Sequence, residues 1–417
     1  MDRRAFLAVV LTFILLIAWQ YFVILPKSRE LARKRALEMK ARKADTTEST
    51  ESQKPENVQR EVQEAVESES TGRVLEHGVS TFYSDSTFNA PDRFITVVTE
   101  RFKMVLRTDG AEVEQVELLD FTRKDGSLVS LVPEGSKGGF GVYMKDQTGL
   151  RGLSNLNFDA YVTGRKVSGD TTIFLGEGYE SVRVDFVRKG NRGAEVRKSF
   201  YFQRDGYDFG VSVWIKREGD LLSTTGYGLV WDAGLSVTEK NKKYDLRQFA
   251  SLGMVGDEFY QIPLRNFKKT KSRREEGTVI WAGARTKYFL VASIVDEESR
   301  RSGSLELKGD ASGEFVGFAL EFPFRGDPRV VEDHYTCYVG PLDMKGLKAY
   351  GIGLERTIDL GKLRFLSVAI LKLMLFMRKF IPNYGLIIVI LSIMTCLLYT
   401  SDAADEGLGV DLGGRRI

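Results

Sequence analysis

A long apolar run lies near the N-terminus of this chain. Residues 5–25 read AFLAVVLTFILLIAWQYFVIL, in which only Thr12 and Gln20 are plainly polar. About twenty apolar residues match the hydrocarbon core of a bilayer, so the run predicts a transmembrane helix. The alternatives are a buried core helix, which rarely lacks a polar face, and a cleaved signal peptide. Because Pro26 and Lys27 follow the run instead of a small-residue cleavage site, we favour an uncleaved anchor.

The composition confines membrane segments to a small part of the chain. Of 417 residues, 43% are hydrophobic and 28% are charged, and the mean hydropathy is −0.19, so the chain is not embedded in a membrane throughout. Lys and Arg number 60, and Asp and Glu number 57, so bulk charge does not indicate nucleic-acid binding. The chain has two cysteines, Cys337 and Cys396, and two histidines, His77 and His334. These numbers exclude a disulfide framework and a cysteine-rich metal site, and they leave little room for histidine chemistry.

The charges after the apolar run leave its orientation open. Two arginines precede the run, whereas eight Lys and Arg residues lie between positions 27 and 43. The positive-inside rule alone would place the rest of the chain in the cytoplasm, but long domains translocate regardless of flanking charge. The same segment favours a helical extension, since two glutamates lie four residues before basic residues. Residues 44–72 are rich in Ser, Thr, Glu and Gln and lack aromatic residues, which predicts a disordered or weakly helical tether.

The central part alternates apolar and polar residues with the period of a half-buried β-strand. Residues 182–186 and 318–324 show this alternation. Residues 96–121, around Asp109-Gly110, and residues 200–213, around Asp205-Gly206, each predict a hairpin that turns at Asp-Gly. Such strands at short spacing from about residue 75 to 335 predict a mainly β fold, an antiparallel sandwich larger than an immunoglobulin domain.

Three features of the central part resemble binding or catalytic motifs, but each has a simpler structural interpretation. The glycine-rich segment 135–141 lacks the residue order of a phosphate-binding loop, so we interpret it as a hairpin loop. The basic run 268–274 could contact lipid head groups, but two glutamates follow it and we expect a solvated loop. His334 has no nucleophile or second base at a recognisable spacing, so we expect a histidine at a strand edge. No catalytic residue is predicted.

A helical pattern follows the central part. Residues 365–377 contain one charged residue, Lys372, and Arg378 and Lys379 come directly after them. Because Lys372 and Lys379 are seven residues apart, they share a helix face. An apolar helix with a thin basic stripe suits the membrane interface, where lysine stems reach toward head groups, although a helix buried against other helices is the alternative. After a proline, residues 384–395 predict the start of a second transmembrane span.

An ordered set of short motifs extends from the central part into these helices. They are Tyr338-Val-Gly-Pro341, Leu347, Gly353-Leu354, Asp359, Gly361 and Asn383-Tyr-Gly385, supported by Trp281, Tyr288-Phe289, the stretch Ser199 to Phe202, Tyr207, the hairpin from Thr99 to Glu117 and the N-terminal anchor. In this order and combination the chain resembles the YidC-type bacterial membrane protein insertases. Each motif alone is weak, but the ordered combination is specific and covers nearly everything up to Thr395.

The resemblance implies a periplasmic antiparallel β-supersandwich, a cytoplasmic N-terminus and a place in the bacterial inner membrane. It implies a core of five helices around a hydrophilic groove, with a basic residue in the first core span. Because a charge at the bilayer centre costs about 2.5 to 3.5 kcal/mol on insertion scales, such a groove would lower the barrier for polar segments. Function would then be binding and release, without enzymatic chemistry, cofactor or metal. The expected partners are nascent membrane proteins and the lipid bilayer, with the Sec translocon and the ribosome as further candidates and no direct contact with nucleic acid.

The chain departs from the family pattern at the groove. Counted from Asn383, the family's groove arginine falls at position 396, which is Cys396 here, whereas Ser392 matches the polar residue one turn earlier. Residues 396–417 are acidic and glycine-rich and no longer resemble the family. We expect this tail to be a translated sequencing adapter joined to a truncated reading frame. A natural acidic tail is the alternative, but polar residues begin at Ser401, before a span is complete.

The sequence thus predicts six parts. They are an anchor at 1–26, a charged extension and tether at 27–72, the β domain at 73–345, a linker with the interfacial helix at 346–380, the start of a second span at 381–395 and the tail at 396–417. Two other functions stay open, because fold does not fix function. One is a membrane-tethered periplasmic carbohydrate-binding or carbohydrate-modifying β-sandwich, and the other is a periplasmic scaffold that docks partner proteins.

Overall fold

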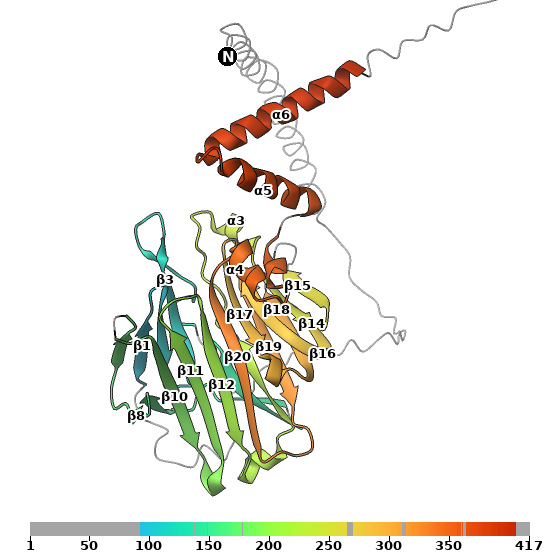
Figure 1. Ribbon diagram of the computed structural model, residues 1–417. Helices are drawn as coiled ribbons and strands as arrows, with labels where there is room; N and C mark the ends of the chain where they lie inside the picture. Colours follow the sequence, from blue (N-terminus) through green and yellow to red (C-terminus); the bar gives the residue numbers. More distant parts are fainter. Residues whose placement is uncertain are drawn as a thin grey trace, which may run out of the picture. The chain divides into compact units, whose positions relative to one another are not determined.

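A computed structural model describes residues 92–405, apart from positions 137, 148, 177, 265–269, 311–313, 360 and 362–363. All of them belong to the second of two compact units, Thr71–Ile417 (Figure 1). The anchor, the extension and the tether expected within residues 1–72 lie outside the described residues, as do positions 406–417 of the expected tail.

A five-stranded sheet comes first along the chain, in the order β4-β3-β2-β1-β9. Its strands are β1 (Phe94–Val98), β2 (Phe102–Arg107), β3 (Glu112–Thr122), β4 (Leu128–Ser130) and β9 (Thr171–Phe174). The first four pair antiparallel, whereas β1 and β9 are parallel. The hairpin predicted around Asp109-Gly110 is confirmed. Its first arm is two strands rather than one, because the chain turns back at Thr99, whose N–H donates to the Phe102 carbonyl at 2.9 Å.

A fifteen-stranded sheet completes the sandwich, in the order β6-β5-β13-β19-β18-β16-β17-β20-β12-β11-β10-β7-β8, with β14 paired to β15 and β16. Its strands are β5 (Gly141–Asp146), β6 (Gly149–Gly152), β7 (Asp159–Val162), β8 (Arg165–Lys166), β10 (Ser181–Lys189), β11 (Glu195–Gln203), β12 (Asp208–Lys216), β13 (Gly226–Trp231), β14 (Ala250–Val255), β15 (Glu258–Pro263), β16 (Thr270–Arg285), β17 (Phe289–Val295), β18 (Ser302–Asp310), β19 (Phe315–Pro323) and β20 (Val330–Pro341). The hairpin predicted around Asp205-Gly206 is confirmed as β11–β12. The predicted mainly β, antiparallel supersandwich is therefore confirmed.

One long strand, β16, takes part in both layers of this sheet. Its residues 270–278 pair with β18, and residues 281–285 pair with β14 and β17. Gly277 lies at the change of partner with φ +150°, a conformation that residues with a Cβ rarely adopt. The sheet therefore folds over at this glycine and faces itself across a core.

Aromatic side chains fill much of that core. The rings of Phe200 and Phe202 lie 6.3 Å apart and that of Phe209 lies 5.3 Å from Phe202, all three stacked. Phe140 meets Trp231 edge-on at 4.8 Å. These residues come from β11, β12, β13 and a connecting segment, so the core joins elements that are distant in sequence. The ring contacts add stabilisation to that from the apolar area that the rings bury.

Four sequence-based expectations for this domain are wrong in detail. β19, expected to be half-buried, is buried from Val316 to Phe322, because Arg274 and Lys145 cover the outward carboxylate of Glu321. The segment 135–141 connects β4 of one sheet to β5 of the other instead of closing a hairpin. A Cβ at Gly139 would lie 2.3 Å from the Val113 carbonyl, so glycine permits the close crossing.

The other two corrections concern charged residues placed in loops or at edges. The described part of the basic run, from Thr270 to Arg274, belongs to β16 rather than to a solvated loop. His334 lies within β20, opposite Ser212 of β12, and its carbonyl accepts from the Asp296 N–H at 3.1 Å on the other side. It is therefore not at a sheet edge. A short run of charged residues occurs in solvated loops and also on strands that are exposed on one face. The sequence pattern therefore did not distinguish a loop from a strand here.

Among the described residues, the helices are short up to the last strand, and the two long ones, α5 and α6, follow it. The α-helices are α3 (Lys242–Leu246), α4 (Met344–Ala349), α5 (Arg364–Arg378) and α6 (Tyr384–Asp405), and the 3-10 helices are η4 (Asn191–Gly193), η5 (Gly219–Ser223), η7 (Glu297–Ser299) and η8 (Leu354–Thr357). Leu347 of α4 and Leu354 of η8 are fully buried against the β domain, and the Trp281 indole donates to the Ile352 carbonyl at 3.1 Å. Packing of the domain thus continues past position 345. No helix among the described residues is long and apolar enough to cross a bilayer.

Candidate functional site

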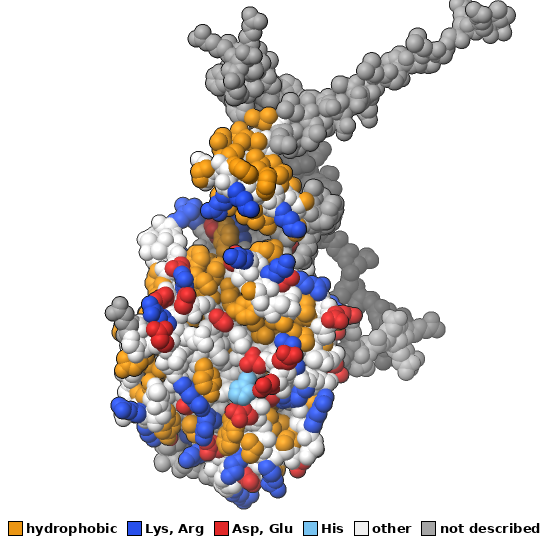
Figure 2. Space-filling model, in the orientation of Figure 1, with side chains coloured by type: hydrophobic (Ala, Val, Ile, Leu, Met, Phe, Trp, Pro, Cys, Tyr) orange, Lys and Arg blue, Asp and Glu red, His pale blue; other side chains and the backbone are white. Residues whose placement is uncertain are grey.

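The residues singled out from the sequence lie on or beside α5 and α6. Lys372 and Lys379 are exposed, one within α5 and the other directly after it. Large apolar side chains surround them on the surface, and Figure 2 shows hydrophobic side chains over much of these two helices. The exposed ones on and just after α5 are Ile370, Leu373, Leu375, Phe376 and Phe380. Such an exposed apolar surface marks an interaction or membrane face.

The third basic residue, Arg378, connects the two helices. Its guanidinium lies over the Tyr384 ring, 4.6 Å from the centroid, and donates to the Tyr384 hydroxyl. The Asn383 side chain accepts from the Gly385 N–H at 2.8 Å and so satisfies the start of α6. Arg378 therefore has a defined role at the α5–α6 turn that its position in the sequence did not show.

The two expected groove residues lie one turn apart on α6. The Ser392 hydroxyl donates to the Ile388 carbonyl of its own helix at 2.9 Å, which satisfies its hydrogen within the helix. Cys396 is exposed and forms no disulfide. Four residues separate them, so they share a helix face.

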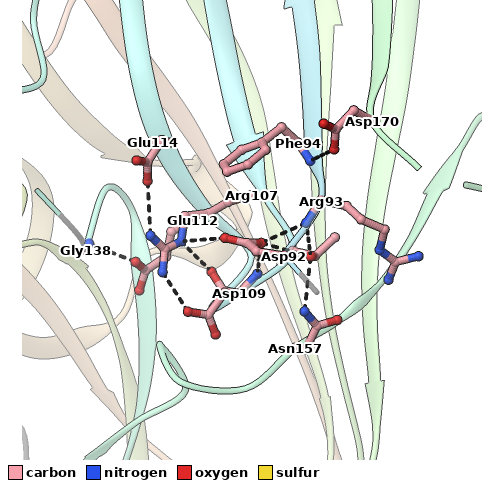
Figure 3. A network of polar contacts seen from close by, with 11 residues as sticks. Asp92, Arg93, Phe94, Arg107, Asp109, Glu112, Glu114, Gly138, Asn157 and Asp170 are labelled. Carbon is pink, nitrogen blue, oxygen red and sulfur yellow. Dashed lines mark hydrogen bonds and ion pairs between the residues drawn. The ribbon is translucent and has the colours of Figure 1, made fainter. Parts of the chain in front are cut away.

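A buried polar network lies inside the β domain (Figure 3). The Arg107 guanidinium, with only 7% of its side chain exposed, reaches the carboxylates of Asp109 at 2.7 Å and Glu114 at 3.1 Å. Glu112 is 1% exposed and accepts from the Gly138 N–H at 2.8 Å. These contacts join the β2–β3 hairpin to the segment that crosses between the two sheets, so the network is structural.

A lysine completes this network from the other sheet. Lys198 of β11 is 1% exposed, and its ammonium donates to the carbonyls of Ala111, at 2.7 Å, and Phe140. Burial lowers the pKa of Lys198 to about 8 against the attraction of Glu112, and burial raises the pKa of Glu112. Sequence analysis missed this buried lysine, although Lys198 lies two residues before the core residue Phe200 and therefore on the same face of β11.

A second buried cluster joins the facing layers near the start of β20. Arg301 makes a two-pronged ion pair with Asp333, and the Asp333 carboxylate also accepts from the Tyr227 hydroxyl of β13. The Tyr227 and Tyr335 hydroxyls lie 2.6 Å apart. Burial and the neighbouring Asp333 raise the pKa of Tyr335 well above its usual value. Each polar group here has a protein partner, which is the pattern of a structural cluster.

Two of the clefts on the surface of the β domain contain residues that bear on its function. One, of about 560 Å³, lies over β10, β11, β12 and β20 and includes Arg183, Asp208, Asp296 and His334; Figure 2 shows acidic side chains around the histidine on this face. Its two carboxylates are already engaged, Asp296 with the Thr336 hydroxyl at 2.8 Å and Asp208 with that of Tyr350. This cleft therefore shows no free pair of carboxylates for acid and base chemistry.

The larger cleft, of about 750 Å³, lies where β20 ends and α4 begins. Its walls come from β3, from the segment around α3, from the β16–β17 turn and from residues 341–343 and 358–359. It includes Tyr244, Lys287 and Tyr288, which sequence analysis did not bring together because they lie far apart in the chain. Among the described residues, no group of three or more His, Cys, Asp and Glu side chains is placed to hold a metal ion.

These features define a β-supersandwich with structural polar networks, followed by two apolar helices. The family model described as the YidC periplasmic domain matches residues 94–373. The chain therefore belongs to this family, which confirms the resemblance found in the sequence, and the β-supersandwich is a YidC-type periplasmic domain.

Several curated relatives carry the name membrane protein insertase YidC. That of Chlorobaculum tepidum is 25% identical over 407 residues, covering 95% of this chain and 65% of the relative. That of Chloroherpeton thalassium is 24% identical, covering 95% and 66%, and that of Chlorobaculum parvum is 25% identical, covering 81% and 57%. The chain thus spans about two thirds or less of the length of these relatives.

Solved structures resemble the fold only distantly. A galactose mutarotase related enzyme from Lactobacillus acidophilus is 10% identical with a TM-score of 0.37, covering 59% of this chain and 97% of that one. An α-N-acetylgalactosaminidase from Bifidobacterium bifidum is 12% identical with a TM-score of 0.41, covering 63% and 39%. Likeness at this level gives no support to the carbohydrate alternative.

Proposed function

We propose that this chain belongs to an inner-membrane protein insertase and chaperone, which assists insertion and folding of membrane proteins without enzymatic chemistry. The observation that carries the proposal is the family match over residues 94–373, together with relatives named as insertases along 95% of the chain. The proposed clients are nascent membrane proteins, and the Sec translocon and the ribosome are proposed as further partners. The N-terminus is proposed to be cytoplasmic, with the β domain in the periplasm.

The two C-terminal helices support the membrane part of this proposal. α5 exposes large apolar side chains next to Lys372 and Lys379, the combination that favours a helix lying at the bilayer interface. Arg378 fixes the turn into α6 through Tyr384. We propose that α6 contributes Ser392 to a hydrophilic groove, in which Cys396 stands where the family has a basic residue.

A chimera tests the proposed function. Residues 92–396 of this chain would replace the matching segment of the Chlorobaculum tepidum relative, in cells that depend on that relative for growth. We expect the chimera to support growth, and a chimera that also carries Cys396→Arg to support it at least as well. The unmodified relative is the positive control. A chimera that accumulates in the membrane but does not support growth would contradict the proposal.

A further inference from the structure

We propose that the end of the β domain at α3 and α4, around the 750 Å³ cleft, is a docking surface for anionic phospholipid headgroups. This inference goes beyond the proposed function and depends on its membrane location. The surface consists of the cleft and five lysines around it, called the basic rim below. They are Lys240, Lys243, Lys287, Lys345 and Lys348.

The basic rim is assembled from three segments that meet at the cleft. Glu239 and Tyr244 line the cleft from the α3 side, Lys287 and Tyr288 from the β16–β17 turn, and Asp343 from the start of α4. The lysines lie beside these lining residues in the chain or within α4. Figure 2 shows basic side chains at the upper end of the β domain, where Figure 1 shows α3 and α4.

Charge around the cleft is predominantly positive, whereas the cleft lining itself carries two cations, Arg285 and Lys287, and three carboxylates, Glu239, Asp343 and Asp359. The segments 239–247, 286–288 and 342–348 together carry seven Lys and Arg residues and three Asp and Glu residues. Two of the acids serve the fold, since buried Asp245 accepts from the Thr238 N–H at 2.8 Å and Asp343 caps α4 through the Gly346 N–H at 2.7 Å. Lys242 is left out of the basic rim because Glu314 pairs with it at 2.5 Å. An anionic surface attracts such a cluster, by about fivefold per basic residue.

Aromatic side chains accompany the lysines. Tyr244 and Tyr288 are 50% and 43% exposed, and the Lys287 ammonium lies 5.3 Å from the Tyr244 ring centroid and 4.5 Å from that of Tyr288. Exposed tyrosines next to lysine stems suit the headgroup level of a bilayer, where one end of each side chain is apolar and the other is wet. The cleft beneath them is walled by Phe121 and Phe289.

The length of the chain keeps this end close to the interfacial helix. Ile358 and Asp359 line the cleft, and Asp359 pairs with the buried Arg285 at 3.7 Å. α5 begins at Arg364, five residues later, and five residues span at most about 18 Å. If α5 lies on the bilayer as proposed, the cleft can lie no farther than this from the start of that helix.

The test uses the full chain in lipid nanodiscs, with a spin label in the cleft. Gln248→Cys places the label on the cleft wall, in a Cys396→Ser background, since Cys337 is buried and does not react. Accessibility to a water-soluble nickel reagent is compared in discs of phosphatidylcholine alone and discs that also contain phosphatidylglycerol. A label at Leu222→Cys, near the start of β20 and so about 40 Å from the cleft along that strand, is the control.

We expect the anionic discs to shield the label at position 248 and to leave that at 222 accessible. Removing three charges of the basic rim with Lys243→Gln, Lys287→Gln and Lys348→Gln should weaken docking by about a hundredfold and abolish the shielding. Lys287→Arg should retain it. The matched control removes three charges at the opposite end, with Lys189→Gln, Lys216→Gln and Arg325→Gln, and should change nothing.

Three results would overturn the inference. Equal accessibility of position 248 in both kinds of disc would exclude docking driven by lipid charge, even though the chain is anchored. Shielding that survives the triple substitution would assign the contact to another surface or partner. A chain that does not stay with the discs at all would contradict the proposed membrane location, and the inference would fail with it.

Discussion

At the scale of single residues, the least expected feature is a lysine inside an apolar core. Lys198 donates to the carbonyls of Ala111 and Phe140, and the carboxylate of Glu112 attracts its charge. Burial disfavours both charges, which is why the pKa of Lys198 falls and that of Glu112 rises. The two hydrogen bonds of Lys198 tie the carbonyls of Ala111 and Phe140 to β11, so its replacement removes more than one contact.

Replacing Lys198 with Met should destabilise the β domain by about 1 to 3 kcal/mol at pH 7, because the buried carbonyls of Ala111 and Phe140 lose their donor. Adding Glu112→Gln should recover part of this loss, with a coupling of about 0.5 to 3 kcal/mol, because the stranded carboxylate is then gone. Urea denaturation of the single and double variants measures both values. The exposed Lys189→Met at the end of β10 is the control and should cost less than about 0.5 kcal/mol.

The same variant has a signature in its pH dependence. The pKa of Lys198 is about 8 in the folded protein and 10.5 is its ordinary value, so the unfolded chain binds more protons between these pH values. Stability therefore rises with pH across this window, and the cost of burying the charged amine is fully present below it. The increase in the free energy of unfolding across this pH window should be smaller in Lys198→Met, because the variant lacks this titrating group. Parallel pH profiles for the two proteins would show that Lys198 is not the buried cation described here.

At the scale of elements, β16 decides how the large sheet folds over. Its first part pairs with β18 and its last part with β14 and β17, with Gly277 between them. A Cβ at Gly277 would lie 2.7 Å from a Val255 methyl, in addition to the strain of φ +150°. Glycine therefore serves here both for its backbone freedom and for the space that it leaves.

Gly277→Ala should destabilise the domain by about 1 to 3 kcal/mol through these two effects. Val255→Ala in the same chain should relieve the steric part and leave the backbone part. Gly164→Ala is the matched control, since it has φ +80° and no atom within 4 Å of a built Cβ, so it reports the backbone cost alone. Thermal melting of the four proteins separates the effects. Equal losses for Gly277→Ala and Gly164→Ala would show that the bend in β16 is not tightly packed.

The hairpins could be predicted from sequence, whereas the bend and the crossing could not. Around Asp109-Gly110 and Asp205-Gly206 the strands are neighbours in sequence, so turn chemistry and alternation agree locally. The segment at Gly139 and the bend at Gly277 depend on contacts with distant parts of the chain, Val113 and Val255, which no local pattern reveals. The same holds for the basic rim, whose lysines are spread from position 240 to position 348. The burial of Lys198 could be predicted only in part. Its position two residues before Phe200 puts it on the inward face of β11, but a charged side chain is normally expected at the surface.

At the scale of the whole molecule, the β domain does not end with its last strand. Leu347 of α4 and Leu354 of η8 are fully buried in a cluster with Trp281, Leu290 and Tyr338. Thr357 is buried as well and donates to the Leu354 carbonyl at 2.8 Å. This segment closes one side of the domain before the chain continues toward α5, so the folding unit includes it.

A fragment of residues 71–359 should accordingly fold alone as a soluble monomer with a cooperative melt, whereas a fragment ending at Asp343 should be much less stable. The shorter fragment loses two buried leucines, each contributing about 1.5 to 3 kcal/mol, and the Trp281 indole loses its acceptor at Ile352. Its tryptophan emission should shift to the red as Trp281 becomes exposed to water. Circular dichroism melts, sedimentation and fluorescence of both fragments provide the measurement, and Leu347→Ala with Leu354→Ala in the longer fragment should reproduce the loss. Equal melting of the two fragments would mean that the segment after β20 adds nothing to the domain, and aggregation of both would mean that the sandwich needs the membrane helices to fold.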